Sequence, residues 1–270
     1  TGSESGLVGY WNFNEGTGST LTDQTSNGND GTIYGASWSD DVPTPPADPP
    51  PVGNHSLSFD GDGDYVQVPS TSIYNFEQGQ DFSVSTWFKT DESYYGLHAL
   101  VSRDHVDGNP GPGWQLGFTH DYGGSMIFTI HDQTNDQLYY LWGGQGGTYS
   151  DNSWHNITIV VDQGVNGSMV LYVDGTIEDS WSGNLSIDVS NSDNLLVGID
   201  RNYNNSINAY IDNTAIWDIA LSQAEIQSYM STSPTGSESG LVGYWNFNEG
   251  SGSTLTDQTS NGNDGAIHGA

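Results

Sequence analysis

Short segments of alternating apolar and polar residues, separated by turns rich in Gly, Asn, Asp and Ser, run through most of the chain. Residues 82–89, FSVSTWFK, alternate most clearly, with Phe82, Val84 and Trp87 apolar. Period-two alternation is typical of β-strands that bury one face. We expect further strands within residues 7–15, 32–38, 56–69, 97–103, 113–120, 126–132, 137–143, 154–162, 169–176, 195–200 and 209–218. About a dozen short strands at this spacing predict an all-β sandwich or jelly roll.

Two segments break this pattern. Residues 219–230, IALSQAEIQSYM, predict one short helix, with Ser222 as its N-cap and Glu225 completing a capping box. Residues 43–51, PTPPADPPP, predict a stiff polyproline-type stretch that cannot join a sheet. This stretch is either a loop insertion or a spacer between domains.

Residues 1–36 and 235–270 have almost the same sequence. We call them the first copy and the second copy. They differ only at Thr17 against Ser251, Thr32 against Ala266, and Tyr34 against His268. Such a duplication predicts one full period of a tandem array followed by the start of the next period. We therefore expect a domain at residues 1–230, a linker at 231–234, and the start of the next repeat at 235–270.

Composition supports one large domain without disulfide bonds. Only 33% of the 270 residues are hydrophobic. The 9 Trp, 15 Tyr and 8 Phe are large side chains, however, and they can build a core of ordinary size. The chain has no cysteine. No apolar run is long enough to predict a membrane-spanning segment.

Charge narrows the range of partners. The formal net charge is −31, and Lys89, Arg103 and Arg201 are the only cationic Lys or Arg side chains. Such a chain repels nucleic acid and anionic membranes and attracts cations, above all calcium. Solubility in a saline environment explains this charge more simply than a specific polycationic partner does.

Several motifs then occur in a characteristic order: GLVGYWNFNEGTG, LSFDGDGDYVQVP, FSVSTWFK, WHNITIVVD, LYVDGT, LLVGID and YIDNTAIWDIALSQAEI. This ordered set resembles the laminin G-like, concanavalin A-like jelly-roll family in its bacterial tandem-repeat form. The resemblance implies two curved antiparallel sheets and, in many members, a structural calcium site. It also implies ligand binding by loops at one rim or on the concave face. It implies no reaction, because the fold hosts both binding modules and enzymes.

Calcium is the cofactor we expect. The DGDGD turn at residues 60–64 opens like an EF-hand loop, but Thr71 stands where that loop needs a bidentate Glu, so we reject an EF-hand. In the family that the chain resembles, calcium is typically bound by residues of the first strand, an early turn and the last strand. Carried over to this chain, the candidate ligands are Asn14 or Glu15, Asp23, Asn27, Asp60 and Asp212. The alternative is that these residues cap turns or are solvated.

A carbohydrate-binding surface is the second candidate. Aromatic rings stack on sugar faces, and polar side chains bond sugar hydroxyls. Residues between Tyr94 and Trp142 are rich in such groups. The candidate ligand-binding residues are Arg103, Trp114, His131, Trp142, Arg201 and Tyr203. Packing in the core is the alternative for any single aromatic residue.

Catalysis is not expected. Retaining glycanases on this fold place paired carboxylates on one strand in an E-x-D-x-x-E pattern. No predicted strand of this chain carries that pattern. We therefore expect a protein that is not an enzyme.

The second copy raises the question of what buries it. As an isolated strand it would expose Tyr244, Trp245 and Phe247 together with an unpaired edge. It could dock on a neighbouring molecule, fold back as a permuted first strand, or pack non-specifically outside. We expect the first copy to complete its own domain and the second to be lent to a neighbour.

Two functions remain, and they are not exclusive. The first is a calcium-stabilised structural or adhesive repeat unit of an extracellular or cell-surface array, forming fibres by strand exchange. The second is a carbohydrate-binding module of a large secreted protein. Expected partners are neighbouring copies of the repeat and a polysaccharide or surface glycan, with no nucleic acid and no membrane insertion.

Overall fold

The computed structural model describes Val8 and residues 17–34, 55–92, 96–104, 111–119, 125–132, 134–144 and 149–270. By its internal contacts the chain divides into two units, Thr1–Pro46 and Ala47–Ala270. Each unit is described separately. The expected Pro-rich stretch at 43–51 and most of the expected strand at 7–15 lie outside the described residues.

The first unit contains a small two-stranded hairpin. Strands β1 (Thr20–Leu21) and β2 (Gly31–Thr32) pair antiparallel. Asp23 organises the turn between them: its carboxylate accepts hydrogen bonds from the Thr25 backbone, the Thr25 hydroxyl and the Asn29 backbone, at 2.8–2.9 Å. An Asp that bonds nearby backbone groups in this way stabilises a turn.

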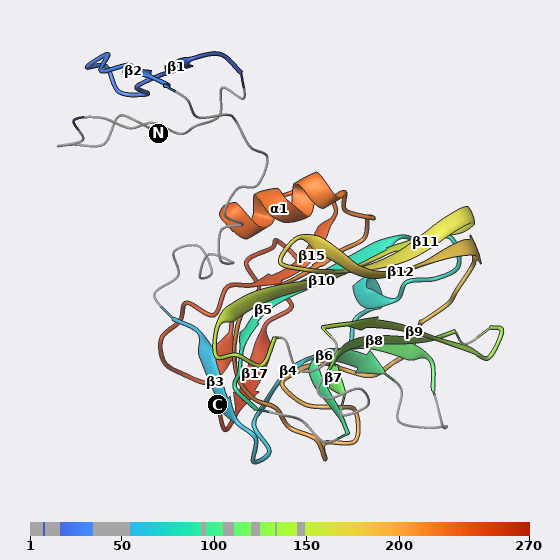
Figure 1. Ribbon diagram of the computed structural model, residues 1–270. Helices are drawn as coiled ribbons and strands as arrows, with labels where there is room; N and C mark the ends of the chain where they lie inside the picture. The colour runs from blue at the N-terminus through green and yellow to red at the C-terminus, as the bar shows by residue number, and fades with distance from the viewer. Residues whose placement is uncertain are drawn as a thin grey trace. The chain divides into compact units, whose positions relative to one another are not determined.

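The second unit is a sandwich of two antiparallel sheets (Figure 1). The seven-stranded sheet has the order β12-β11-β10-β5-β14-β15, and β3 also pairs with β14. Its strands are β3 (Leu57–Asp60), β5 (Phe82–Lys89), β10 (Trp154–Asp162), β11 (Gly164–Val173), β12 (Thr176–Leu185), β14 (Asn208–Trp217) and β15 (Leu241–Trp245).

The eight-stranded sheet has the order β16-β17-β4-β13-β6-β7-β8-β9. Its strands are β4 (Tyr65–Val68), β6 (Leu97–Asp104), β7 (Gly113–Thr119), β8 (Ser125–Asp132), β9 (Gln137–Gly143), β13 (Leu195–Val197), β16 (Thr254–Leu255) and β17 (Gly265–His268). A 3-10 turn, η1 (Ser72–Tyr74), follows β4. The expected all-β jelly-roll sandwich is confirmed.

The main core lies between the two sheets. Alternation in β5 sends Phe82, Val84 and Phe88 into it, and the ring of Phe82 stacks on Phe76 at a centroid distance of 4.4 Å. A second apolar cluster covers the outer face of the seven-stranded sheet, where Trp217 and Tyr244 meet Ile226 of α1 (Gln223–Ser231). The predicted helix and its capping box between Ser222 and Glu225 are both confirmed.

The second copy is part of the sandwich. Strand β15 pairs with β14 in one sheet, and β17 pairs with β4 in the other. Trp245 is fully buried, and Tyr244 and Phe247 are each 3% exposed. The domain boundary expected at residue 230 is therefore wrong, because residues 241–268 supply strands to both sheets. The second copy therefore folds back as a permuted strand, and the expectation that the first copy completes this domain while the second is lent to a neighbour is wrong.

One long strand was not expected. β12 (Thr176–Leu185) lies at the end of the seven-stranded sheet and pairs with β11. Its sequence, TIEDSWSGNL, contains few apolar residues, and most of its side chains are exposed or half-buried. Without one continuous buried face, the apolar alternation that reveals a strand is missing.

Candidate functional site

The outer face of strands β6 to β9 carries a row of polar and aromatic side chains. On β7, Trp114, Leu116 and Phe118 point into the core. Successive strand residues point to opposite faces, so Gln115 lies on the outer face. In the register of the sheet Gln115 pairs with Thr129, and Thr129 pairs with Tyr140. Three neighbouring strands thus place an amide, a hydroxyl and an aromatic ring side by side.

This face contains a cavity of about 210 Å³. The residues lining it come mainly from β6 to β9 and from the turn after β13. They are Leu97, Asp104, Gly113, Thr129, His131, Leu138, Tyr140 and Arg201. The cavity therefore unites His131 and Arg201, two of the six predicted ligand-binding residues.

Two buried polar atoms have no hydrogen-bond partner within the described part of the chain, one on the cross-strand neighbour of the lining residue Thr129 and one on a lining residue. They are Nε2 of Gln115 and Nδ1 of His131. Nε2 of His131 lies 3.0 Å from Oδ1 of Asp136. When that nitrogen donates to the carboxylate, Nδ1 of a neutral ring is an acceptor. The site thus offers one buried donor and one buried acceptor, and leaving such groups unsatisfied is costly.

Arg201 lies at the cavity wall in an ion pair. Its Nη1 lies 2.8 Å from Oδ2 of Asp104, and both side chains are largely shielded from solvent. The pair leaves little net charge at this wall of the cavity. The sequence analysis did not identify three residues of this site: Asp104, Gln115 and Thr129.

Aromatic and apolar side chains form the exposed rim. Tyr140 is 48% exposed and stacks on half-buried Trp142, with ring centroids 6.1 Å apart and planes 25° apart. Leu138, also on β9, is 38% exposed. The predicted residue Trp142 therefore supports the ring of Tyr140 on this face without lining the cavity itself.

The structure places Arg103 and Trp114 inside the sandwich. Arg103 is fully buried, and its guanidinium donates to the backbone oxygens of Tyr74 at 3.0 Å and Asn191 at 2.8 Å. Burial lowers the pKa of Arg103 to about 10. Trp114 is 1% exposed in the core. Neither side chain can contact a ligand in this arrangement, which corrects that part of the expected site.

Tyr203 lies outside the cavity, two residues after Arg201. It is 45% exposed and packs edge-on against Tyr65, with ring centroids 5.2 Å apart. Tyr65 in turn stacks on His268 of the second copy at 4.4 Å. This aromatic cluster lies near β4 and β17, in the same eight-stranded sheet as the cavity.

Asp60 and Asp212, the calcium candidates described in the second unit, do not come together. Asp60 pairs with Asn208 across β3 and β14, four residues from Asp212. At a rise of about 3.3 Å per residue this separation is roughly 13 Å, too far for two carboxylates to share one ion. Asp23 and Asn27 belong to the other unit, where Asp23 accepts hydrogen bonds from its own turn and Asn27 donates to the Val8 oxygen. Asn14 and Glu15 lie outside the described residues.

Within the described ranges, no three His, Cys, Asp or Glu side chains form a group that could hold a metal ion. Asp212 is buried, and Asn213 donates its backbone N–H to it at 2.7 Å. Burial raises the pKa of Asp212 to about 7. The calcium site therefore stays a prediction without a described set of ligands.

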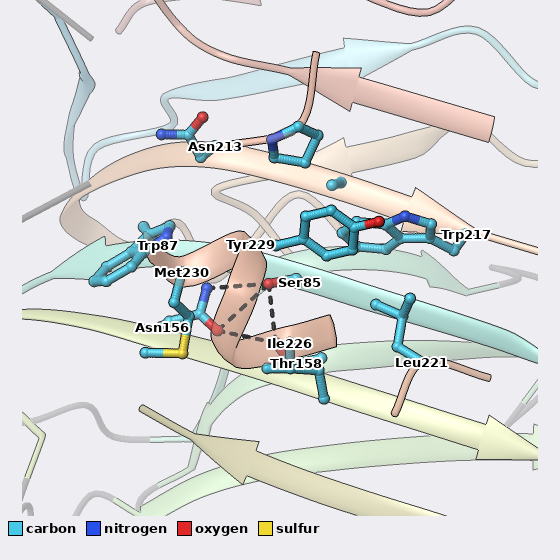
Figure 2. A pocket seen from close by; sticks show the side chains of 12 residues that line it. Ser85, Trp87, Asn156, Thr158, Asn213, Trp217, Leu221, Ile226, Tyr229 and Met230 are labelled. Atoms are coloured by element: carbon cyan, nitrogen blue, oxygen red, sulfur yellow. Dashed lines mark hydrogen bonds between the residues drawn. The ribbon is translucent and has the colours of Figure 1, made fainter. Parts of the chain in front are cut away.

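A second, much smaller pocket of about 20 Å³ lies between α1 and the seven-stranded sheet (Figure 2). Its floor is a network in which Thr158 donates to Ser85 or Asn156 at 2.9 Å, and Asn156 donates to Ser85 at 3.0 Å. Its wall includes Trp217 and Tyr229 of the second apolar cluster. The volume is enough for about one water molecule. Because its polar groups satisfy one another, we interpret this pocket as structural.

A third polar cluster surrounds His155. Its Nδ1 lies 2.8 Å from Asp174 and its Nε2 lies 3.1 Å from Asp151, while the ring of Tyr149 packs edge-on against it. Burial opposes charging of the ring, but the two carboxylates outweigh this and raise the pKa of His155. Both nitrogens are occupied, so this His has no free position for acid–base chemistry.

Within the described residues, no helix is both long and apolar enough to cross a membrane. Two packed antiparallel sheets, one with a polar, aromatic-rimmed cavity on its outer face, define a jelly-roll domain. The chain belongs to the concanavalin A-like lectin/glucanase superfamily, whose model matches residues 60–227. The resemblance predicted from the motifs is therefore confirmed. No protein of curated function matches the chain in sequence.

Solved structures share the fold. A protein from Bacteroides ovatus named for carbohydrate binding is 13% identical, with a TM-score of 0.56 over 93% of this chain and 66% of that one. A heptameric SAP-like pentraxin from Limulus polyphemus is also 13% identical, with a TM-score of 0.50 over 79% of this chain and 95% of that one. At these identities the likeness shows the fold alone.

The binding domain of Paraclostridial Mosquitocidal Protein 1 is 18% identical, with a TM-score of 0.49. The match covers 79% of this chain and 50% of that domain. The chain therefore spans about half the length of that binding domain.

Proposed function

We propose that residues 55–270 form a carbohydrate-binding module whose site is the cavity on the outer face of β6 to β9. The observation that carries this proposal is the pair of buried, unpartnered polar atoms, Nε2 of Gln115 and Nδ1 of His131. A sugar hydroxyl both donates and accepts, so it can satisfy an amide donor and an imidazole acceptor together.

The rim supplies the apolar contact that a sugar ring needs. Tyr140 is half exposed and is held in place by its stack on Trp142. At about 210 Å³ the cavity is smaller than the roughly 300–1,000 Å³ of pockets for drug-sized ligands. A single sugar ring or a chain end therefore suits the site better than a buried oligosaccharide.

Charge favours a neutral glycan. The chain carries a net charge of −31, which repels acidic sugars at long range. Arg201, the cation lining the cavity, is paired with Asp104 at 2.8 Å. The site therefore offers hydrogen bonds to hydroxyls with little excess positive charge for a carboxylate.

The test uses two exposed tyrosines. Tyr140→Ala should weaken binding of a glycan selected on an array by about tenfold, the value of losing one aromatic contact. Tyr210 on β14, in the other sheet, is similarly exposed at 47%, so Tyr210→Ala is the matched control. Titration calorimetry measures both. An array blank at millimolar sensitivity, or equal losses in both variants, would count against the proposal.

A second function, compatible with the first, is that of a non-catalytic repeat unit in an extracellular or cell-surface tandem array. The specific observation in its favour is that residues 235–270 supply strands to both sheets while residues 1–36 carry nearly the same sequence. The first copy then has the sequence needed to complete a preceding sandwich. Such a unit is structural or adhesive, and neighbouring repeats are its partners.

Calorimetry on a lengthened chain tests the array. Residues 37–270 are appended once more after Ala270, so that two sandwiches each have a copy at their end. The array proposal predicts that the total unfolding enthalpy doubles, because each unit has its own core. An enthalpy equal to that of the single chain would contradict it.

Calcium stabilisation belongs to the same proposal. The described carboxylates form no metal-holding group, so its support is the net charge of −31, whose self-repulsion bound divalent cations would offset. EDTA should then lower the melting temperature by many degrees, and added calcium should restore it. A melting temperature that responds to neither would remove calcium from the account.

A further inference from the structure

The two copies form the same local hairpin in different surroundings. In the second copy, the Asp257 carboxylate accepts hydrogen bonds from the Thr259 backbone at 3.0 Å, its hydroxyl at 2.9 Å and the Asn263 backbone at 2.9 Å. Asp23 of the first copy makes the corresponding three bonds at 2.8–2.9 Å. The strand register is also the same: Leu21 faces Gly31 in one hairpin, and Leu255 faces Gly265 in the other.

A longer-range contact is repeated as well. Nδ2 of Asn261 donates to the Val242 oxygen at 3.0 Å, and Nδ2 of Asn27 donates to the Val8 oxygen at 3.2 Å. The first copy thus holds the turn geometry of the second while belonging to the other unit, whose described residues form the two-stranded hairpin β1-β2. Its local structure is organised before any docking.

The two copies differ in how far a corresponding side chain is exposed. Val242 is 6% exposed in the sandwich, whereas Val8, its counterpart, is 76% exposed. Tyr34 is exposed at 88%, but its counterpart His268 is exposed as well, so the contrast lies at Val8. The first copy therefore presents apolar surface of a kind that the second copy buries.

The surface that receives the second copy is defined by two strands, and we call it the edge site. It consists of the side of β14 that pairs with β15 and the side of β4 that pairs with β17. The fit is close: a Cβ on Gly265 would lie 2.7 Å from Cγ1 of Val66. Gly31 stands at the corresponding position of the first copy, so the same close approach is available to it.

The three differences between the copies fall on exposed side chains, although Ala266 and His268 lie in β17 and His268 stacks on Tyr65 of β4. Ser251, Ala266 and His268 are all exposed. Every buried residue of the second copy therefore has an identical counterpart in the first, including Trp245, which matches Trp11. No difference in sequence between the copies falls on a side chain that the edge site buries.

We propose that the first copy of one chain occupies the edge site of a second copy of this chain, where it replaces residues 235–270. The inference deepens the tandem-array function and rests on it. A hairpin that is already folded loses less conformational entropy on docking than an unstructured strand would. In a tandem array, the covalent link further raises the local concentration of the next first copy. Repeats could then exchange strands between molecules as well as along one chain.

Three full-length variants test whether the copies are interchangeable. Trp245→Asp disables the second copy, Trp11→Asp disables the first, and the third variant carries both changes. Trp11→Asp alone should melt like the parent chain. The proposal expects Trp245→Asp to keep a cooperative transition that the double variant lacks. If adding Trp11→Asp to Trp245→Asp changes nothing in the melting curve, the proposal is overturned.

Cross-linking tests whether the exchange occurs between molecules. The chain has no cysteine, so engineered thiols are unambiguous. Ala266 pairs with Gln67 in the sandwich, and Thr32 corresponds to Ala266. A recipient carrying Trp11→Asp, Trp245→Asp and Gln67→Cys is unfolded together with a Thr32→Cys donor, and the two are refolded under oxidising conditions.

The expected product is a disulfide-linked heterodimer, identified by its mass. The control donor carries Thr32→Cys and Trp11→Asp and should give none. No heterodimer with the first donor, or equal yields with both, would overturn exchange between molecules. The doubled-chain calorimetry remains a separate test, so failure of exchange and failure of the array are distinguishable.

Discussion

His155 shows how single residues set the response of this domain to pH. The carboxylates of Asp174 and Asp151 flank its two ring nitrogens at 2.8 and 3.1 Å, and they raise its pKa despite burial. A raised pKa in the folded state means that the charged ring stabilises the fold. This contribution is complete below the unfolded pKa of about 6.5 and is lost as pH rises through the raised value.

The pH prediction compares the parent chain with His155→Gln. The free energy of unfolding, measured by urea titration from pH 5 to pH 9, should favour the parent most at the acidic end. The difference should shrink as pH rises, because the parent loses its charged ring there. The other titrating groups are shared by both chains and cancel in the difference. A difference that is constant across this range would contradict the role of His155.

The side chains at the cavity show where residue-level prediction succeeds. His131 and Arg201 were predicted, because an imidazole and a guanidinium near polar loops suggest ligand binding, and both line the cavity. Arg103 was misplaced for a physical reason. A register shift between Ala99 and Val101 in β6 reverses the alternation, so Arg103 lies opposite Trp114 and points inward. No local signal in the sequence marks this bulge.

Gln115 could have been found from the sequence. In GWQLGFT the apolar residues Trp114, Leu116 and Phe118 alternate with it, so Gln115 belongs to the opposite face. What alternation cannot supply is the identity of its neighbours. Thr129 and Tyr140 come beside Gln115 only through the order of strands in the sheet, which is a long-range property.

Among the elements, α1 follows local rules that the sequence contains in full. Ser222 accepts from the Glu225 backbone, and Glu225 accepts from the Ser222 backbone at 2.8 Å. Strand β5 was likewise predicted to the residue, because its alternation faces a core. In contrast, β12 was missed because a largely solvent-exposed strand lacks that alternation.

Removing the N-cap side chain of α1 should lower the stability of the domain. Ser222→Ala should lower the free energy of unfolding by about 1 kcal/mol, because the first turn of α1 loses its side-chain acceptor. Ser228→Ala, at an exposed position inside the same helix, is the matched control and should cost nothing, since Ala favours helix. Urea unfolding measures both. Equal effects of the two substitutions would show that the cap does not stabilise α1.

At the scale of the whole molecule, the folded domain does not have the same boundaries as the sequence repeat. The duplication is visible in the sequence, but the expectation that the first copy closes this sandwich was wrong. The sequence could not decide between the copies, because the first copy has the same residues at the positions that the second copy buries. The choice depends on which end of the chain reaches β14 and β4. Residues 241–268 reach both strands, so the folding unit runs from near residue 55 to residue 270.

Truncation tests this boundary. Residues 47–270 should unfold cooperatively with the midpoint of the full chain. Residues 37–234, which lack both copies, should show no cooperative transition. Removing buried Trp245 and Phe247 alone costs about 3–5 kcal/mol each, and a domain of this kind has roughly 5–15 kcal/mol in total. A cooperative transition in 37–234 would contradict the assignment of the second copy to the sandwich.

A glycan bound in the cavity near Gln115 should change the NMR signals of the residues around it. A ¹H–¹⁵N correlation spectrum of the full chain is recorded during titration with a neutral oligosaccharide selected on an array. The side-chain amide of Gln115 should shift with the bound fraction, as should the backbone amides of Thr129 and Tyr140. Binding that leaves these three signals unchanged, with shifts confined to other strands, would contradict the cavity as the binding site.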